Sequence, residues 1–310
     1  MRKLSIVATM YRSAPYLREF VARAVTAARQ IAEDFEIVLV NDGSPDESLQ
    51  IALDLQSEQR SIRVVDLSRN FGHHKAMMTG LEYSRGERVF LIDCDLEECP
   101  EWLQDFHRMM DANSVDVVYG RQAQRRGGFW ERAPGEVFYR MMSFLTDEDI
   151  PANMVTARLM TRRYVESLLK FREQTAFLYG LWHITGYSQQ ACPVTKKLKD
   201  SSSYTLRRKL TVAVNAITSF SEKPLIWIFY LGVLILGLSA AAIVYIVIQK
   251  IFYEITIDGW TSLIVSIWFI GGLIIFVLGL IGIYLSRIFI ETKHRPYTLV
   301  RAVHESKDAQ

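Results

Sequence analysis

Two long apolar runs in the last third of the chain limit its fold more than any other feature. Residues 224–248 and 262–286 contain no Asp, Glu, Lys, Arg or His. A helix of about 25 residues is about 37 Å long, enough to cross the ~30 Å hydrocarbon core of a membrane. Because charge-free runs of this length are rare in soluble cores, the sequence predicts two transmembrane helices.

The charges around these runs predict their orientation. The short connection at 249–261 has one Lys and two acidic residues, whereas basic residues flank both runs on the other side: Arg207, Arg208, Lys209 and Lys223 before the first, and Arg287, Lys293, Arg295 and Arg301 after the second. Basic flanks favour the cytoplasm. We therefore expect a multi-pass protein of the cytoplasmic (inner) membrane, with an external loop at 249–261, a cytoplasmic tail at 287–310 and both termini in the cytoplasm. Neither run has an ionisable residue, which favours anchoring over transport.

The residues ahead of the spans have the composition of a cytoplasmic globular domain. The first apolar stretch ends at Met10, which is too short for a signal-peptide core. Over the whole chain, 36 Lys and Arg against 34 Asp and Glu give a net charge of +2, so no nucleic-acid partner is expected. Three cysteines without a CxxC pattern support neither a zinc site nor a disulfide framework. We expect a cytoplasmic domain over 1–200 and an amphipathic juxtamembrane helix over 201–223.

Short apolar runs alternate with helical patterns in the first domain. The sequence predicts strands at 4–9, 36–41, 62–66, 88–92 and 115–119, and helices at 15–34, 46–56, 72–83 and 100–113. This alternation is typical of an α/β fold with a mostly parallel sheet, in which ligands bind beyond the carboxyl ends of the strands. There is no GxGxxG or P-loop pattern, so neither a dinucleotide site nor a Walker ATPase is supported.

Carboxylates follow two of these strands. Asp93 and Asp95 come directly after the fourth strand, where two carboxylates can hold Mg²⁺ or Mn²⁺ together with substrate phosphates, and Glu97 can add a ligand. Asp42 follows the second strand. Two interpretations of Asp42 stay open, a contact to a base or ribose and an Asx-turn that serves Gly43 and Ser44.

The segments VNDGSPDES, LSRNFGHHKAMMTGLEYSRG, LIDCDLEECPE and FYRMMSFLTDEDIP, followed by two spans that end in ETKHRP, resemble family 2 glycosyltransferases. In particular they look like the polyprenyl-phosphate branch, similar to dolichol-phosphate mannose and glucose synthases. The resemblance implies a GT-A (Rossmann-like) fold, a UDP-sugar donor, a divalent ion (Mg²⁺ or Mn²⁺), inversion at the anomeric carbon, and a homo-oligomer (dimer or tetramer).

The resemblance also assigns roles to residues. Donor binding falls on Thr9, Tyr11, Asp42, Arg69, Gly72, Lys75 and Asp93; the metal on Asp93, Asp95 and Glu97; and catalysis on Asp95, Arg132 and Arg158. The branch often has Asp where this chain has Thr156. A sugar-hydroxyl acceptor needs a base, whereas a phosphate monoester, with a second pKa of ~6, is already largely dianionic at neutral pH. The loss of Asp therefore favours a phosphate acceptor.

Basic and polar residues are predicted to receive that phosphate, because Arg and Lys suit phosphate recognition. They are Arg121, Arg125, Lys196, Lys199, Tyr204 and Arg207. The expected reaction is transfer of a sugar from a UDP-sugar to polyprenyl phosphate, undecaprenyl phosphate in a bacterium. The product is a polyprenyl-phospho-sugar for surface polysaccharide or glycan modification. Two alternatives are transfer to the hydroxyl of a lipid-linked glycan, and a non-catalytic, membrane-tethered protein that binds nucleotide-sugar.

Overall fold

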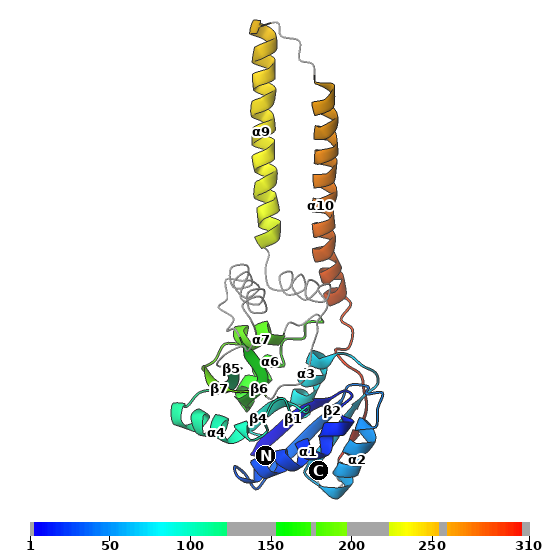
Figure 1. Ribbon diagram of the computed structural model, residues 1–310, viewed down its shortest axis with the longest axis vertical. Helices are drawn as coiled ribbons and strands as arrows, with labels where there is room; N and C mark the ends of the chain where they lie inside the picture. Colours follow the sequence, from blue (N-terminus) through cyan, green and yellow to red (C-terminus); the bar gives the residue numbers. More distant parts are fainter. Residues whose placement is uncertain (1–2, 123–152, 175–177, 197–222, 254–258, 306–310) are drawn as a thin grey trace. The chain divides into compact units, whose positions relative to one another are not determined.

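The computed structural model describes residues 3–122, 153–174, 178–196, 223–253 and 259–305 (Figure 1). The chain divides into two compact units. The first comprises Met1–Val212 together with Arg295–Gln310, and the second comprises Ala213–His294. Residues 295–310, which follow the apolar runs, therefore belong to the first unit, which the sequence did not predict.

An eight-stranded sheet is the framework of the first unit. Its strands lie in the order β7-β5-β6-β4-β1-β2-β3-β8, and all neighbours pair in parallel except β6 with β4 and β5, and β8 with β3. The bounds are β1 Leu4–Met10, β2 Phe35–Asn41, β3 Ile62–Leu67, β4 Arg88–Asp93, β5 Val117–Gln122, β6 Met154–Thr161, β7 Gln189–Val194 and β8 Val300–His304. The five predicted strands are confirmed as β1–β5, and the sheet is mixed.

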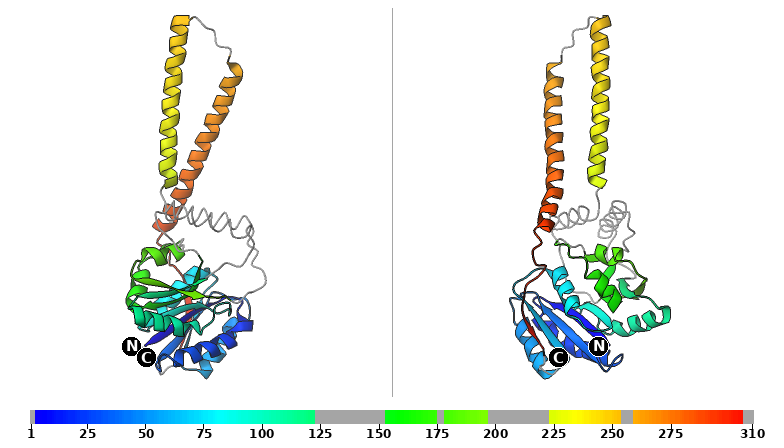
Figure 2. Two further views of the ribbon diagram at one scale, coloured as in Figure 1. Left: turned by 60° about the vertical axis from the view of Figure 1, so that its left-hand side comes forward. Right: turned by 180° about the vertical axis from the view of Figure 1, so that it is seen from behind.

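Helices cover both faces of this sheet (Figures 1 and 2). They are α1 Ala14–Arg29, α2 Ser48–Glu58, α3 His73–Tyr83, α4 Trp102–Asn113, α6 Arg162–Leu168 and α7 Leu178–Ile184. The four helices predicted in this region are confirmed as α1–α4, although α1 ends earlier than expected. Alternate residues of β1, Leu4, Ile6, Ala8 and Met10, join the buried core formed with α1, α2 and α4.

Helix α3 packs unusually close to the opposite face. A Cβ added at Gly80 would lie 2.4 Å from Cγ1 of Val7 and 2.9 Å from Cγ2 of Val40, so only glycine fits between this helix and strands β1 and β2. The helix begins at His73, immediately after Gly72, whose φ is 99°. The close approach of α3 thus brings its first turn to the carboxyl ends of β1 and β2.

The segment after the last helix re-enters the sheet as its edge strand. Ser68 N donates to Leu299 O at 2.8 Å, and β8 pairs antiparallel with β3. Arg301 donates to Asp66 Oδ2 at 3.3 Å, and Glu305 accepts from Arg63 Nε at 2.9 Å. Residues 287–310, expected to form a cytoplasmic tail, therefore include a strand that completes the sheet of the first unit.

The second unit contains α9 Lys223–Tyr253 and α10 Trp260–Thr292. Among the described residues, one helical segment, Ile270–Thr292, is long and apolar enough to cross a membrane, with a mean hydropathy of 2.5, and Leu225–Ile235 is a shorter apolar stretch. One of the two predicted spans is thus supported, and the second is not confirmed. The predicted juxtamembrane helix at 201–223 lies outside the described residues except for Lys223.

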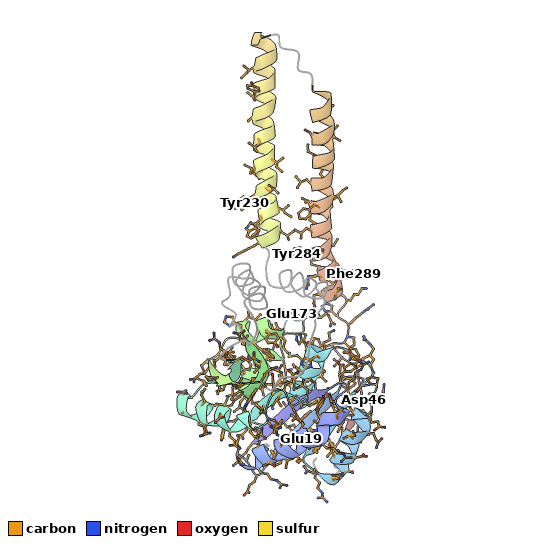
Figure 3. All side chains as sticks on the ribbon, viewed as in Figure 1. Glu19, Asp46, Glu173, Tyr230, Tyr284 and Phe289 are labelled. Carbon is orange, nitrogen blue, oxygen red and sulfur yellow. The ribbon has the colours of Figure 1, made fainter. Side chains whose placement is uncertain are left out.

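Large apolar side chains of these helices are exposed. Ile275 of α10 is 73% exposed, and Phe229 and Tyr230 of α9 are 66% and 64% exposed. Figure 3 labels Tyr230 on α9, and Tyr284 and Phe289 in the last turns of α10. Aromatic residues near helix ends are typical of membrane–water interfaces.

Ending the chain after residue 299 removes β8 and is expected to destabilise the first unit. The loss includes backbone hydrogen bonds worth about 1 kcal/mol each and the Glu305 partner of buried Arg63, so the free energy of unfolding should fall by about 3 kcal/mol. Thermal unfolding of the purified protein in detergent measures this change. A chain ended after residue 305 keeps β8 and is the control. Equal melting temperatures for the two shortened chains would contradict the structural role of the strand.

Candidate functional site

A cavity of about 510 Å³ lies at the carboxyl edge of the sheet, where the sequence places ligand binding. Its walls come from the ends of β1, β2 and β4 and from the start of α3. The lining residues are Thr9, Met10, Tyr11, Ser13, Asp42, Asn70, Gly72, His73, Asp93, Cys94 and Asp95. Six predicted site residues, Thr9, Tyr11, Asp42, Gly72, Asp93 and Asp95, are therefore brought together.

Asp42 holds the loop that precedes α3. Its Oδ1 accepts from Phe71 N at 2.7 Å and its Oδ2 accepts from Gly72 N at 3.1 Å. Burial raises the pKa of Asp42, although these two hydrogen bonds favour the charged form. Of the two interpretations left open for Asp42, the Asx-turn is not made by this residue: Asn41 makes it, with its Oδ1 accepting from Ser44 N at 3.1 Å. A contact of Asp42 with a nucleoside stays a prediction.

Asp46 ties the loop after β1 to the loop after β2; Figure 3 labels it on the first unit. Its Oδ1 accepts from the hydroxyls of Ser44 and Ser48, at 2.5 and 2.6 Å, and its Oδ2 accepts from Ala14 N at 3.3 Å. Ser44 Oγ in turn accepts from Arg12 N at 2.7 Å. The backbone beside Tyr11 and Ser13 is thus fixed before any ligand arrives.

Asp93 is the last residue of β4, at the carboxyl edge of the sheet. Thr9 and Asp93 are register partners in β1 and β4, and His73 from α3 contacts both: Nδ1 lies 3.1 Å from Thr9 Oγ1 and Nε2 lies 3.2 Å from Asp93 Oδ1. Burial alone would lower the pKa of His73, but the negative charge of Asp93 outweighs it and raises that pKa. Burial likewise opposes the charge on Asp93, but His73 and Thr156 stabilise it, so the pKa of Asp93 is lowered.

The acidic motif fits a divalent ion in part. Asp93 and Asp95 line the same cavity and offer the carboxylate oxygens that a hard cation prefers, although Asp93 Oδ1 already lies 3.2 Å from His73 Nε2. Mg²⁺ needs only one or two carboxylates when substrate phosphates complete its shell. Among the described residues no three acidic, His or Cys side chains converge as metal ligands, and a metal site formed by Asp93, Asp95 and Glu97 stays a prediction.

A buried ion pair adjoins this motif. Glu98 is fully buried; its Oε1 accepts from Thr156 N at 3.0 Å and Lys196 Nζ at 2.9 Å, and its Oε2 accepts from Ala157 N at 2.8 Å. Burial and the nearby Asp93 raise the pKa of Glu98. Lys196, predicted to bind the acceptor phosphate, is therefore brought to the metal motif, 4.0 Å from Glu97 Oε2.

Arg158 does not reach the cavity. The side chain is fully buried, donates to the carbonyl oxygens of Thr156 and Val155, and its guanidinium lies over the ring of Trp182. Burial lowers the pKa of Arg158. The predicted catalytic role is not favoured by this position, because a group without solvent access cannot touch a substrate.

Three other predicted residues are described but do not line the cavity. Arg69 lies over the ring of Phe71, 4.1 Å from its centroid, and Arg121 is exposed at the end of β5. Lys75 donates to Gln174 Oε1 at 3.0 Å and lies 5.0 Å from the ring centroid of Tyr297. The remaining predicted residues, Arg125, Arg132, Lys199, Tyr204 and Arg207, lie outside the described residues.

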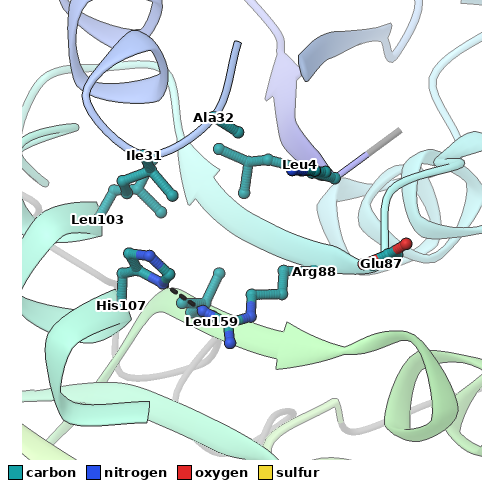
Figure 4. Close-up of a pocket in the computed structure, with 9 residues that line it drawn as sticks. Leu4, Ile31, Ala32, Glu87, Arg88, Leu103, His107 and Leu159 are labelled. Carbon is teal, nitrogen blue, oxygen red and sulfur yellow. Dashed lines mark hydrogen bonds between the residues drawn. The ribbon is translucent and has the colours of Figure 1, made fainter. Parts of the chain in front are cut away.

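The sequence did not single out Met10, Ser13, Asn70 and Cys94 as lining residues, and it did not assign Glu98 a role. A second cavity, of about 290 Å³, lies at the other end of β1 and β4 (Figure 4). There Arg88 contacts His107 and Asp111. Since ligands of such sheets bind at the carboxyl edge, the larger cavity is the candidate active site.

Comparison with known proteins identifies the family. The family described as "Glycosyl transferase family 2" matches residues 5–169, which include β1–β5 and the whole acidic motif. The chain belongs to glycosyltransferase family 2. Its mixed α/β sheet is GT-A-like, as expected, and the cavity lies within the matched region.

Relatives of this glycosyltransferase match along nearly its whole length. A protein of Mycobacterium tuberculosis named "Putative glycosyltransferases" is 48% identical over 98% of this chain and 89% of its own length. The "Bactoprenol glucosyl transferase" of Shigella phage SfV is 29% identical over 86% of this chain and 88% of its own. Among solved structures, S. aureus TarS in complex with UDP-GlcNAc aligns with a TM-score of 0.46 at 20% identity, covering 70% of this chain and 66% of that chain.

Replacing Asp46 by Ala is expected to destabilise this glycosyltransferase at neutral pH by about 1–2 kcal/mol, because several hydrogen bonds to the carboxylate are lost. Burial opposes the charge on Asp46, but the Ser44 and Ser48 hydrogen bonds outweigh it and lower the pKa from 3.8 to about 2. The stabilisation is therefore fully present above about pH 4 and is lost as the pH falls toward 2.

Urea unfolding of the wild type and of Asp46→Ala at pH 7 and at lower pH measures this effect. The exposed Asp105, paired with Arg108 on α4, gives the control variant Asp105→Ala, which should change stability little. A difference between wild type and Asp46→Ala that stays constant down to pH 2 would show that the charge of Asp46 is not what stabilises the loops.

Proposed function

We propose that the protein is a membrane-anchored, inverting glycosyltransferase that transfers a sugar from a UDP-sugar to polyprenyl phosphate. The observation that carries the proposal is the cavity at the carboxyl edge, which Asp93 and Asp95 line, with the ammonium group of Lys196 held beside the neighbouring Glu97 and Glu98. Relatives named "Bactoprenol glucosyl transferase" from Shigella phages SfV and SfX support a polyprenyl-phosphate acceptor.

In this proposal the cavity receives the nucleotide-sugar. The loops held by Asp42 and Asp46 form its walls, and Asp93 and Asp95 face the diphosphate. These two carboxylates would hold Mg²⁺ or Mn²⁺, and the ion would neutralise negative charge on the leaving diphosphate. Thr9 and His73 fix the orientation of the Asp93 carboxylate.

The acceptor needs no deprotonation in this reaction. An oxygen of the dianionic phosphate monoester attacks the anomeric carbon, the bond from that carbon to the diphosphate oxygen breaks, and UDP leaves with inversion. Thr156, which has no carboxylate, is compatible with such an acceptor because no proton has to be removed. Lys196 and Arg121 are the described residues proposed to meet the incoming phosphate.

The acceptor is a lipid, so the site has to lie near a membrane. The apolar segment Ile270–Thr292 supplies one anchor, and we propose that residues 224–248 supply a second, with both termini in the cytoplasm. The exposed isoleucine, leucine and phenylalanine side chains of α10 would then contact lipid rather than water.

The decisive test is turnover by the full-length protein in detergent with undecaprenyl phosphate, Mg²⁺ or Mn²⁺, and a panel of UDP-sugars. One donor should give a labelled, mild-acid-labile lipid. Asp95→Ala should reduce transfer at least 100-fold, on the order of losing one ion-binding carboxylate near the transition state. Asp111→Ala, on the exposed face of α4, is the matched control and should retain activity.

Near-normal activity of Asp95→Ala would overturn the role of that carboxylate. If no donor gives labelled lipid although UDP-sugar still binds, polyprenyl phosphate is not the acceptor. This result would point to a glycan hydroxyl as the acceptor or to a binding role without catalysis.

A further inference from the structure

Glu98 occupies an unusual place beside the candidate site. It lies three residues past Asp95 and is completely buried, yet it is not among the residues that line the cavity. All of its contacts given above are with donors of this chain: the backbone N–H groups of Thr156 and Ala157, and the ammonium group of Lys196. A carboxylate enclosed in this way cannot touch a substrate, so any effect on the reaction passes through its partners.

Lys196 is the partner that can reach a ligand. It lies two residues past β7, which is separated from β4 in the sheet by β5 and β6, so its side chain crosses the carboxyl edge to meet Glu98. The side chain keeps 26% exposure, whereas Glu98 has none. An ammonium group has three donor hydrogens, and the bond to Glu98 uses one of them.

The pairing fixes an otherwise mobile charge. A lysine side chain has several rotatable bonds and loses up to ~2 kcal/mol of conformational free energy when it is held in one position. Glu98 is itself rigid, because β6 supplies two N–H donors to its two oxygens at 3.0 and 2.8 Å. The ammonium group is thereby held 4.0 Å from Glu97, within the acidic motif that faces the donor.

We infer that Glu98 is a positioning residue for the acceptor: it holds Lys196 beside the acidic motif so that the phosphate of the lipid meets a fixed ammonium group next to the donor diphosphate. This inference rests on the proposed function. Glu98 contributes nothing to donor binding in it, and removal of Glu98 acts on the acceptor only through Lys196. A purely structural ion pair would instead link the segment after β4 to β6 and to the segment after β7, and would affect stability alone.

A double-mutant cycle on the full-length protein separates the two roles. The variants are Glu98→Gln, Lys196→Met, the double variant with both changes, and Lys196→Arg. Lys170→Met, at an exposed position two residues after α6, is the control. Each is assayed for the KM of undecaprenyl phosphate, the KM of the UDP-sugar, kcat and the melting temperature. The double variant leaves no unpaired buried charge, so it remains informative if a single variant folds poorly.

The expected result is specific to the acceptor. Glu98→Gln and Lys196→Met should each raise the KM of undecaprenyl phosphate about tenfold, as expected for loss of one charge-assisted hydrogen bond, while the KM of the UDP-sugar stays within about twofold. The double variant should be no worse than the more damaged single variant, because both changes remove the same contact. Lys196→Arg should recover part of the affinity for the acceptor, and Lys170→Met should resemble the wild type.

Two results would overturn the inference. The first is a KM for undecaprenyl phosphate that is unchanged in Lys196→Met. The second is an effect of Glu98→Gln that persists in full when Lys196 is already Met, since this shows that Glu98 acts without Lys196. If the wild type transfers sugar to no polyprenyl phosphate, the proposed function itself is overturned. If the wild type is active and the variants have the same KM for undecaprenyl phosphate, only the inference on Glu98 and Lys196 is overturned.

Discussion

The parallel pairing of β1 with β2 on one side and β4 on the other determines where chemistry can occur in this protein. In this register Thr9 pairs with Asp93 and Met10 pairs with Asn41, so three strands end at the same edge. Residues separated by more than 80 positions in the chain then line one cavity. The absence of a side chain on Gly80 lets α3 approach the same strands and adds His73 to the cavity from the other face.

Carboxylates at this edge do two different kinds of work. The carboxylate oxygens of Asp42 and Glu98 accept hydrogen bonds from backbone N–H groups and so hold the neighbouring segments in place. The donors are Phe71, Gly72, Thr156 and Ala157. Asp93 lines the cavity and contacts His73 there, with Nε2 3.2 Å from its Oδ1. Burying a carboxylate is costly unless it is hydrogen-bonded, so the first two are stabilised by backbone groups of the fold, whereas Asp93 faces the space where a ligand would bind. Such preorganisation lowers the cost of binding, because few groups have to move.

The local part of this fold could be predicted from the sequence and the non-local part could not. Strands β1–β5 are short runs rich in Val and Ile, bounded by turns, and the motif at Asp93 follows one of them directly. Strand β6 has Thr156 and Arg158 inside its apolar run, and Arg158 is buried only because Trp182 and two carbonyl groups receive it. The role of Glu98 could not be predicted from its neighbours in the sequence, because its partners come from β6 and from the segment after β7.

The return of the chain through β8 makes the apolar helices an insertion within the catalytic sheet. During synthesis β3 leaves the ribosome more than 200 residues before β8, the strand that covers its edge. During synthesis this edge, with its unpaired backbone groups, is a template for pairing with other chains until both helices have emerged. A truncated mRNA or nascent chain that ends within the helices would therefore yield a domain with an unpaired edge at β3. Chaperones would bind such a domain and proteases would degrade it.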